Sequence, residues 1–444
     1  MPTHPPRCPD SSSFKSLFSA ILPAIRIGVI FRRLGPAKRR PPKIKGNEII
    51  MGLVFHCLQG AGTLAENIKL CTGKVISEAA VSERRLHLPW TVFLAIMGAA
   101  LRPKAQEVRH GSAFYQGRRL VALDGTQFSV SNTPQILSTL SKAASRRMRA
   151  AFAKVGLCLL VEVGIHNPIA AAIARAGESE MALAKKLLQS LPEKCLLLAD
   201  RLYGVGAFVG LLLQQFKERR GDFWVRVRSN LKPRVLQVYQ DGSALIEVKV
   251  PKMGKVLVRE VRGRVRRPHG KWSEVRLWTT LGDWKQSPAR ELLALYGRRW
   301  EQELIYKELK IDMRQAQLLR SHTAETAAQE IAALVWAYAV VAEERMKAAQ
   351  CGQQEVLRIS FGKTLVMVRA FWLVVEASEG LLDQVQIESM TRKVLGLIAR
   401  QALRPRRKRS CPRAVRQPVG SWPRLTTNTY EIGETQYEVT PIVK

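Results

Sequence analysis

The stretch from Tyr296 to Lys310, YGRRWEQELIYKELK, combines carboxylates, cations and a phenol at spacings that suit phosphate chemistry. In an α-helix, residues seven apart differ by about 20° around the axis, so Tyr296, Glu303 and Lys310 share one face. Arg299 lies one turn before Glu303 on that face. A carboxylate there can bind a hard cation, and Arg and Lys can bind phosphate oxygens. An ordinary solvated helix with i,i+4 ion pairs has the same spacing, so periodicity leaves both interpretations open.

Two further carboxylates stand at the ends of predicted strands. Asp124 ends the aliphatic run in RRLVALDGT, and Asp200 ends the run in KCLLLADRLYG. Asp-Gly is common in turns and Asp is a favoured helix N-cap, so either residue alone could be structural. Ligands of α/β sheets gather at the carboxyl ends of strands, so the two residues together predict one acidic rim. Mg²⁺ prefers such carboxylate oxygens, with room left for water and phosphate.

Hydrophobic periodicity predicts the elements that must position these side chains. From Arg118 onward the pattern predicts three strands, a helix, a strand, a helix and a strand, which is typical of a mixed α/β sheet. Residues 231–281 alternate in polarity between DGS, KMG and HGK turns, which predicts an antiparallel β insertion. One long helix is expected over residues 287–310, and further helices over 324–349 and 365–376.

The N-terminal part is predicted to be helical and to bind DNA. Residues 47–102 show helical periodicity, with Thr63 and Ser77 as candidate N-caps. The helices after these caps resemble a helix-turn-helix, although any small helical bundle gives the same weak pattern. The later helix carries Arg84 and Arg85, and we expect both to contact DNA.

The charge of the whole chain points to a polyanionic partner. Its 444 residues include 71 Lys and Arg against 36 Asp and Glu, a formal net charge of +35. Such an excess repels itself unless phosphates neutralise it, so double-stranded DNA is the first candidate and an anionic membrane surface the second.

Other classes of protein and site are not expected. No run of eighteen apolar residues occurs, so we expect no membrane span, and the N-terminus lacks the order of a secretory signal. The seven cysteines form no C-x-x-C pair, so no zinc site is indicated. We therefore expect a soluble intracellular protein.

Three motifs, in order, resemble one known family. The opening stretch meets in full the pattern Y-x2-R-x3-E-x6-K, which is similar to the signature of the DDE transposases of bacterial insertion sequences, in the group named for insertion sequence four. ALDGT around Asp124 and LLADRLYG around Asp200 resemble that family's two aspartate motifs. The β insertion before the glutamate also looks like the interruption that this group has in its fold. The resemblance covers roughly residues 45–425.

The resemblance implies both a fold and a site. The fold is an RNase H-like mixed sheet flanked by helices and interrupted by the β insertion, with a helical N-terminal DNA-binding domain and a helical C-terminal region. Asp124, Asp200 and Glu303 would be the catalytic residues and would bind two Mg²⁺ ions about 3.5 to 4 Å apart, with Mn²⁺ able to substitute. Three residues would hold DNA phosphates near the scissile bond: Tyr296, Arg299 and Lys310.

The activity that the resemblance implies is cut-and-paste transposition, in which the ends of an insertion sequence are cleaved and the freed 3′-hydroxyl attacks target DNA. The expected partners are terminal inverted repeats, target DNA and a second copy of the chain in a synaptic homodimer. Two alternatives stay open: an RNase H-like nuclease or resolvase without strand transfer, and a non-catalytic DNA-binding protein derived from a transposase.

Some relatives form a DNA hairpin with a base flipped onto a tryptophan of the insertion, where Trp272 and Trp278 lie.

The predicted domain organisation follows from these patterns. The acidic last segment, TNTYEIGETQYEVTPIVK, contrasts with the basic arm before it, and one interpretation is host sequence read through past the usual stop. The parts are residues 1–46, a disordered basic lead-in; 47–115, a helical DNA-binding domain; 116–230, the first part of the catalytic core; 231–281, the β insertion; 282–345, the second part of the core with the glutamate helix; 346–399, C-terminal helices; and 400–444, a basic arm and tail.

Overall fold

The chain forms two compact units in a computed structural model. Unit 1 comprises Met1–Leu196 and Trp300–Ala402, and unit 2 comprises Leu197–Arg299 and Leu403–Lys444. The structure describes residues 43–142, 150–266, 272–314, 316, 318–378, 380–403, 409–410, 431–432 and 436–442.

The sheet of unit 1 is built around β2. This strand (Arg118–Val130) pairs antiparallel with β3 (Ala153–Glu162), which pairs antiparallel with β4 (Asn167–Ile173). Two short strands also pair with β2, β1 (Phe114–Tyr115) antiparallel and β11 (Leu318–Leu319) parallel. Strand β3 is almost wholly buried, as its unbroken aliphatic sequence requires.

Strands and helices follow each other in the predicted order. After β4 come α8 (Glu180–Leu187), β5 (Cys195–Ala199), α9 (Gly206–Arg219) and β6 (Asp222–Arg226). The chain passes from unit 1 into unit 2 within β5. The predicted mixed α/β class is confirmed, with most of the strand pairs antiparallel.

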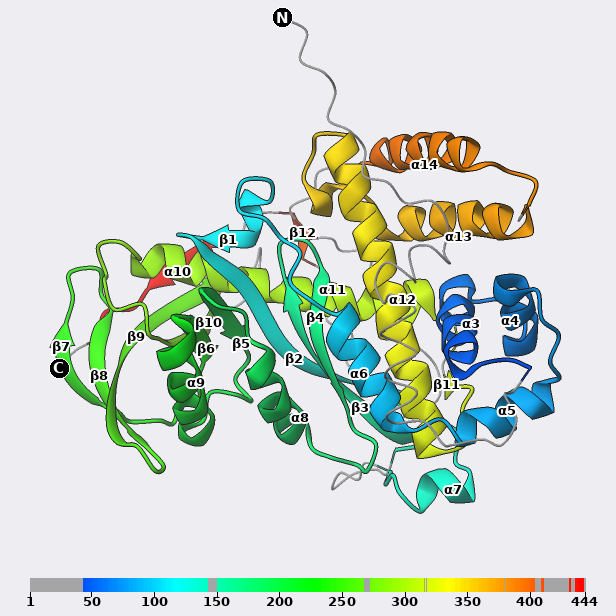
Figure 1. Cartoon of the computed structure of the whole chain (residues 1–444). Helices are drawn as coiled ribbons and strands as arrows, with labels where there is room; N and C mark the ends of the chain where they lie inside the picture. The colour runs from blue at the N-terminus through cyan, green and yellow to red at the C-terminus, as the bar shows by residue number, and fades with distance from the viewer. Residues whose placement is uncertain are drawn as a thin grey trace, which may run out of the picture. The chain divides into compact units, whose positions relative to one another are not determined.

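The helices of unit 1 gather around α12 (Ala324–Cys351), the yellow helix in Figure 1. Its residues are apolar on nearly all sides and mostly buried, because neighbours cover it all round. It contacts two helices that follow it, α13 (Phe361–Ala377) and α14 (Gln384–Ala399). The helices that precede β2 are α3 (Gly46–Gln59), α4 (Leu64–Thr72), α5 (Glu78–Leu86) and α6 (Trp90–Ala100), and the short α7 (Pro134–Leu137) follows it.

The two predicted N-caps are confirmed. Thr63 accepts a hydrogen bond from the backbone of Glu66, and the carboxylate of Glu66 accepts one from the backbone of Thr63. Ser77 accepts one from the backbone of Ala80. The helix expected after Ser77 is divided in two, because Pro89 lacks an N–H and starts a new helix. Among the described helices, no single one is long and apolar enough to cross a membrane; α3 and α4 meet that test only when taken together as a bent pair.

Unit 2 contains the β insertion, and its antiparallel topology is confirmed. The strands β7 (Arg234–Val238), β8 (Ala244–Val250), β9 (Gly254–Arg266) and β10 (Trp272–Thr279) each pair antiparallel with the next. Strand β10 also pairs antiparallel with β6, so the insertion continues a sheet that starts in the predicted core. Helix α9 packs on β8, and α10 (Ala289–Tyr296) packs on β9.

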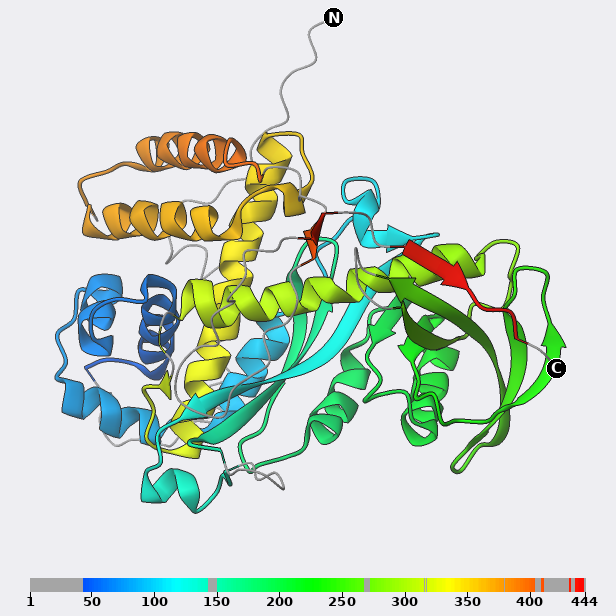
Figure 2. The ribbon, with the colours of Figure 1, turned by 180° about the vertical axis from the view of Figure 1, so that it is seen from behind.

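The end of the chain belongs to this sheet. Strand β14 (Gln436–Val439), the red arrow in Figure 2, pairs antiparallel with the last residues of β9. It continues the edge of β9 at the point where the pairing with β8 ends. The carboxylate of Glu438 lies 2.6 Å from Arg264, and Ile442 is buried. Residues 436–442 of the segment interpreted as a read-through addition are therefore part of the fold of unit 2. Two shorter strands, β12 (Arg409–Ser410) and β13 (Glu431–Ile432), pair with each other.

The expected single helix over residues 287–310 is wrong. The helix α10 ends at Tyr296, a 3₁₀ turn follows over Gly297–Arg299, and α11 runs over Trp300–Lys307. A π-helical turn, Glu308–Met313, then continues α11. Short 3₁₀ and π segments are frequent at functional sites, where they change the direction of side chains.

A buried charged cluster fastens α11 within unit 1. The ring of His166, in the turn between β3 and β4, lies 2.9 Å from the carboxylate of Glu301 and 3.2 Å from that of Glu308. From α12, Tyr338 donates a hydrogen bond to Glu308 at 2.6 Å and Arg345 lies 3.3 Å from it. These contacts join α11 and the π turn to the sheet and to the central helix.

Removing β14 tests whether the tail is structural. We expect deletion of residues 436–444 to expose the edge of β9, so that the amide protons of residues 263–266 exchange faster and the melting temperature falls. Hydrogen exchange read by mass spectrometry measures the first effect. Exchange rates at residues 254–260, which pair with β8, should change less; unchanged rates at 263–266 would contradict the pairing.

The charged cluster predicts how stability depends on pH. Burial lowers the pKa of His166, but Glu308 and Glu301 outweigh it, so the pKa lies above 6.5. Because the folded state binds this proton more tightly, the contribution of His166 is present below about pH 6.5 and is lost as the pH rises through the raised pKa. Burial raises the pKa of Glu308, but His166 and Arg345 lower it to about 2, so its contribution is lost only as the pH falls from about 4.5 towards 2.

Urea unfolding measured from pH 6 to pH 9 checks the histidine. We expect the free energy of unfolding of the wild type to decline over this range, and that of the His166→Gln variant to decline less. A parallel decline in both proteins would show that His166 does not carry the effect. A Lys186→Gln variant serves as a control, because its ion pair with Glu178 is on the surface and contributes at most about 1 kcal/mol.

Candidate functional site

Asp124 lies inside a strand, so the prediction that it ends one is wrong. Strand β2 continues through Val130, and Asp124 pairs with Leu159 of β3. The Asp-Gly pair makes no turn here. A Cβ atom at Gly125 would lie 2.3 Å from the side chain of Glu180 in α8, so the glycine allows a helix to approach the strand closely.

Asp124 shares a face of β2 with Phe128, because side chains alternate along a strand. The Nζ of Lys310 and the Cζ of Arg314 each lie 5.4 Å from the centre of the Phe128 ring. The face that carries Asp124 is therefore the one covered by α11 and its π turn, and Figure 2 shows α11 lying across β2. Helix α8 covers the other face, where Gly125 points.

Two buried side chains of α11 reach the strands below. The hydroxyl of Tyr306 donates to the backbone oxygen of Asp124 at 2.5 Å. The amide of Gln302 donates to the backbone oxygen of Leu159 and to the hydroxyl of Tyr306, both at 3.1 Å. Glu303 lies between them in the sequence and is exposed, three residues before Tyr306 and therefore its neighbour on the helix surface. Unit 1 thus brings α11, with Glu303, onto the strand that carries Asp124.

Electrostatic effects agree with this arrangement. Burial raises the pKa of Tyr306 well above its usual value, and Asp124 raises it further. Burial also lowers the pKa of Lys310, and Arg314 lowers it further, whereas Glu303 acts in the opposite direction. Lys310 is thus within electrostatic reach of Glu303. Arg314, four residues after Lys310, lies outside the family pattern, which ends at Lys310, so the motif did not indicate it.

Unit 2 holds a second group of predicted residues. Asp200 directly follows β5, as predicted, and its carboxylate accepts a hydrogen bond from the backbone of Leu202 at 3.2 Å. Tyr296 ends α10 and is hydrogen-bonded to Arg299, which is buried in the 3₁₀ turn. Burial raises the pKa of Tyr296 to about 12, with Arg299 opposing the increase and Asp200 adding to it. Asp200, Tyr296 and Arg299 therefore form one electrostatic group.

Arg84 and Arg85 make bonds inside unit 1. The guanidinium of Arg85 donates to the backbone oxygen of Thr326 at 2.9 Å, and burial lowers its pKa. Arg84 donates to the backbone oxygen of Ile44. These bonds connect α5 to α12 and to the residues that precede α3, a structural role that the sequence pattern did not indicate. Contact with DNA by either residue stays a prediction.

The two tryptophans of the insertion have different surroundings. Trp278 is buried, and its indole N–H donates to Glu260 at 2.9 Å, so it belongs to the core. Trp272, at the start of β10, is half-buried, and the guanidinium groups of Arg264 and Arg266 lie 5.3 and 5.9 Å from its ring centre.

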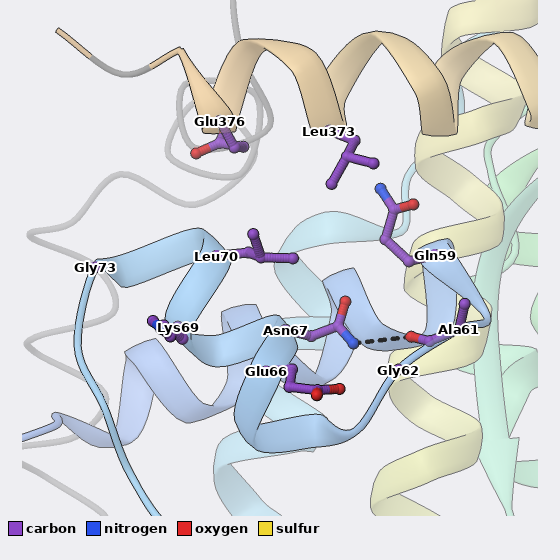
Figure 3. Close-up of a pocket in the computed structure, with 10 residues that line it drawn as sticks. All are labelled: Gln59, Ala61, Gly62, Glu66, Asn67, Lys69, Leu70, Gly73, Leu373 and Glu376. Atoms are coloured by element: carbon purple, nitrogen blue, oxygen red, sulfur yellow. Dashed lines mark hydrogen bonds between the residues drawn. The ribbon is translucent and has the colours of Figure 1, made fainter.

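A cavity of about 600 Å³ in unit 1 is separate from the predicted residues. It lies between the α3–α4 turn and α13, and Figure 3 shows Leu70 and Leu373 lining it from opposite sides. The side chain of Asn67 donates to the backbone oxygen of Ala61 at its edge, at 3.0 Å. None of the residues predicted for catalysis or DNA binding lines this cavity.

The predicted metal ligands divide between the two units. Asp124 and Glu303 belong to unit 1 and Asp200 to unit 2; the two aspartates are half-buried and Glu303 is exposed. Over the described ranges, no group of three or more His, Cys, Asp or Glu side chains is placed to hold a metal ion. The donor chemistry nevertheless fits Mg²⁺, which binds carboxylate oxygens in sites that remain open to water.

Comparisons with known proteins identify the family of the chain. The family model described as "Transposase DDE domain" matches residues 115–340, half of the chain, and this range includes all three predicted carboxylates. The "Transposase InsG for insertion sequence element IS4" of Escherichia coli (strain K12) is 26% identical over 315 residues, which cover 69% of this chain and 70% of that protein.

A cryo-EM structure of the piggyBac transposase synaptic complex with hairpin DNA is 10% identical, with a TM-score of 0.45, over 88% of this chain and 86% of that one. A likeness this low supports no conclusion. The family model and the curated relative are sufficient by themselves, because the matched range contains the aspartate motifs and the glutamate signature together. The chain belongs to the DDE transposase family and is of the IS4 type.

Proposed function

We propose that this transposase catalyses cut-and-paste transposition, in which it cleaves the ends of an insertion sequence and transfers the freed strands to target DNA. The observation that supports this most strongly is the hydrogen bond from Tyr306 of α11 to the backbone of Asp124. It joins the helix that carries Glu303 to the strand that carries Asp124, and the carboxylates, one exposed and one half-buried, remain accessible to a ligand. The position of Lys310 beside Phe128 adds a cation to the same face.

The carboxylates of Asp124, Asp200 and Glu303 supply the oxygen ligands for two Mg²⁺ ions, for which Mn²⁺ can substitute. When bound, such ions activate the attacking water or 3′-hydroxyl and stabilise the charge that develops on the leaving oxygen. The protein's part is to fix the carboxylates and to hold the DNA backbone in line. The catalytic core is RNase H-like in this proposal.

Phosphate groups of the DNA balance a local excess of positive charge. Lys310 and Arg314 both lie on the ring of Phe128, and in the described part of the chain neither makes an ion pair with a carboxylate. The pKa of Lys310 is lowered by burial and then by Arg314, so the two cations repel each other in the absence of an anion. A phosphate between them relieves this repulsion. In unit 2, Tyr296 and Arg299 are proposed to hold a phosphate in the same way.

The partners follow from the reaction and the charge. Terminal inverted repeats and target DNA are the polyanions that a chain with a net charge of +35 attracts. Residues 47–115 are proposed as a DNA-binding domain. Two ends must be paired for transposition, so the active form is proposed to be a homodimer, associated with the nucleoid in the cytoplasm.

Substitution of the carboxylates tests the catalytic assignment. We expect Asp124→Asn, Asp200→Asn and Glu303→Gln each to lower Mg²⁺-dependent cleavage of element ends by on the order of 10³-fold or more, because each removes a metal ligand. Affinity for the ends, measured by gel shift, should persist. The matched control is Glu291→Gln, an exposed carboxylate of α10 that should leave the cleavage rate unchanged.

A Glu303→Gln variant that cleaved at the wild-type rate would overturn the assignment. The wild type should also join precleaved ends to target DNA. Cleavage without joining would instead indicate a nuclease or resolvase, and binding without metal-dependent cleavage would indicate a non-catalytic DNA-binding protein.

The salt dependence of DNA binding tests Lys310 and Arg314. Each phosphate contact contributes about 0.9 to the slope of log K against log salt concentration, so Lys310→Ala and Arg314→Ala should each reduce the slope by about that amount. The loss of affinity should be similar for all DNA sequences. Lys186→Ala is the control, because this residue lies on α8, which covers the opposite face of β2. An unchanged slope for Arg314→Ala would exclude it as a phosphate contact.

A further inference from the structure

We propose that Tyr306 and Gln302 are positioning residues, which hold Asp124 and Glu303 in the register that metal binding requires. This inference rests on the proposed function of the two carboxylates. Neither residue belongs to the family pattern that led to the site, since that pattern specifies positions 296, 299, 303 and 310 of the stretch.

The two side chains form one continuous bridge across two strands. The amide of Gln302 donates to Leu159 of β3 and to the hydroxyl of Tyr306, and that hydroxyl donates to Asp124 of β2. Leu159 and Asp124 are directly opposite each other in the sheet. The helix is therefore bonded to both strands at the level of the aspartate.

This bridge fixes both the rotation and the height of α11. Gln302 and Tyr306 are four residues apart and lie one above the other on the helix, facing the sheet. Glu303 immediately follows Gln302, so it lies at the side of this bonded face. A rotation or a slide of α11 that moved Glu303 relative to Asp124 would have to break at least one of the three hydrogen bonds.

The bridge stabilises the fold less than apolar side chains in the same space would. Gln302 is completely buried, and its side-chain oxygen makes no hydrogen bond to the residues that the structure describes. Tyr306 is 5% exposed. Apolar side chains of similar size would fill the same space without burying a polar group that is only partly hydrogen-bonded. Directional bonds to backbone oxygens instead set a unique register.

Another buried tyrosine of unit 1 provides a matched control. Tyr338 of α12 is also buried and also donates one hydrogen bond, but its acceptor is Glu308. The bond lies in the cluster with His166, which also holds the α11 segment, but it involves neither Asp124 nor Leu159, and His166 and Arg345 still contact Glu308 when the hydroxyl is removed. Replacing either tyrosine by phenylalanine removes one buried hydroxyl, so the two variants should differ in their effect on the metal site and resemble each other in stability.

The experiment uses the full chain and compares three variants with the control Tyr338→Phe: Tyr306→Phe, Gln302→Met and the double variant that carries both of these substitutions. Mn²⁺ binding is measured by calorimetry on the protein bound to precleaved ends of its element, and cleavage is measured against Mg²⁺ concentration. For Tyr306→Phe we expect Mn²⁺ affinity to fall by about 10- to 100-fold, the usual effect of losing a group that orients a metal ligand. The Mg²⁺ concentration for half-maximal cleavage should rise by a similar factor, with affinity for DNA unchanged.

Because both residues act through one bridge, the double variant should lose less than the product of the single losses. Mn²⁺ affinity of Tyr306→Phe equal to that of the wild type, or reduced no more than that of Tyr338→Phe, would overturn the inference. If Tyr306→Phe does not fold, Gln302→Met is judged by the same two outcomes.

Asp124→Asn and Glu303→Gln in the same assays separate the inference from the proposed function. If these variants lose Mn²⁺ binding while Tyr306→Phe keeps it, only the positioning role is wrong. If they too keep Mn²⁺ binding and cleavage, the proposed function itself is wrong.

Discussion

The arrangement of unit 1 depends on hydrogen bonds that tie one helix to the backbone of two strands. Tyr306 and Gln302 bond α11 to Asp124 and Leu159, so the helix cannot shift without leaving buried polar groups unpaired. This attachment determines the position of the Glu303 carboxylate. Chemistry that needs carboxylates within reach of one metal site tolerates little movement, and a bond to a strand backbone is a rigid reference because the sheet itself is fixed by pairing on both sides.

A second attachment holds both ends of the same helix, through Glu301 at its start and Glu308 directly after its end. His166 and Arg345 are buried and Glu308 is half-buried, and these charges are acceptable there because the carboxylate is paired with both cations. The π turn begins at Glu308, between this cluster and Lys310. The helix is thus fixed by neutral bonds at the sheet and by charged contacts at α12. Around Phe128 the balance is different: among the described residues, neither of the two cations there makes an ion pair with a carboxylate, which agrees with the phosphate contacts proposed for them.

Local patterns predicted most of the elements, because strand alternation, helix periodicity and N-caps act over a few residues. Thr63 and Ser77 cap helices as expected, and the four strands of the insertion pair as their turns indicated. The predictions were wrong where a segment far away in the chain determines the local structure. The Asp-Gly pair at Asp124 continues a strand because β3 and β11 pair beyond it and α8 needs the space above Gly125. The tail forms β14 because β9 offers it an edge.

The sequence by itself determined the family and predicted the chemistry: which carboxylates would bind a metal and which cations would bind phosphate. Residue types and motif spacing are properties of the chain, so folding was not needed to recognise them. Only the tertiary structure decided the roles of Tyr306, Gln302 and Arg85, which have no distinctive spacing and whose partners are far away in the chain. Hydrogen bonds between distant segments depend on which surfaces meet, and local periodicity does not contain that information. The stretch YGRRWEQELIYKELK therefore indicates a site, and the strands beneath it determine how that site is held.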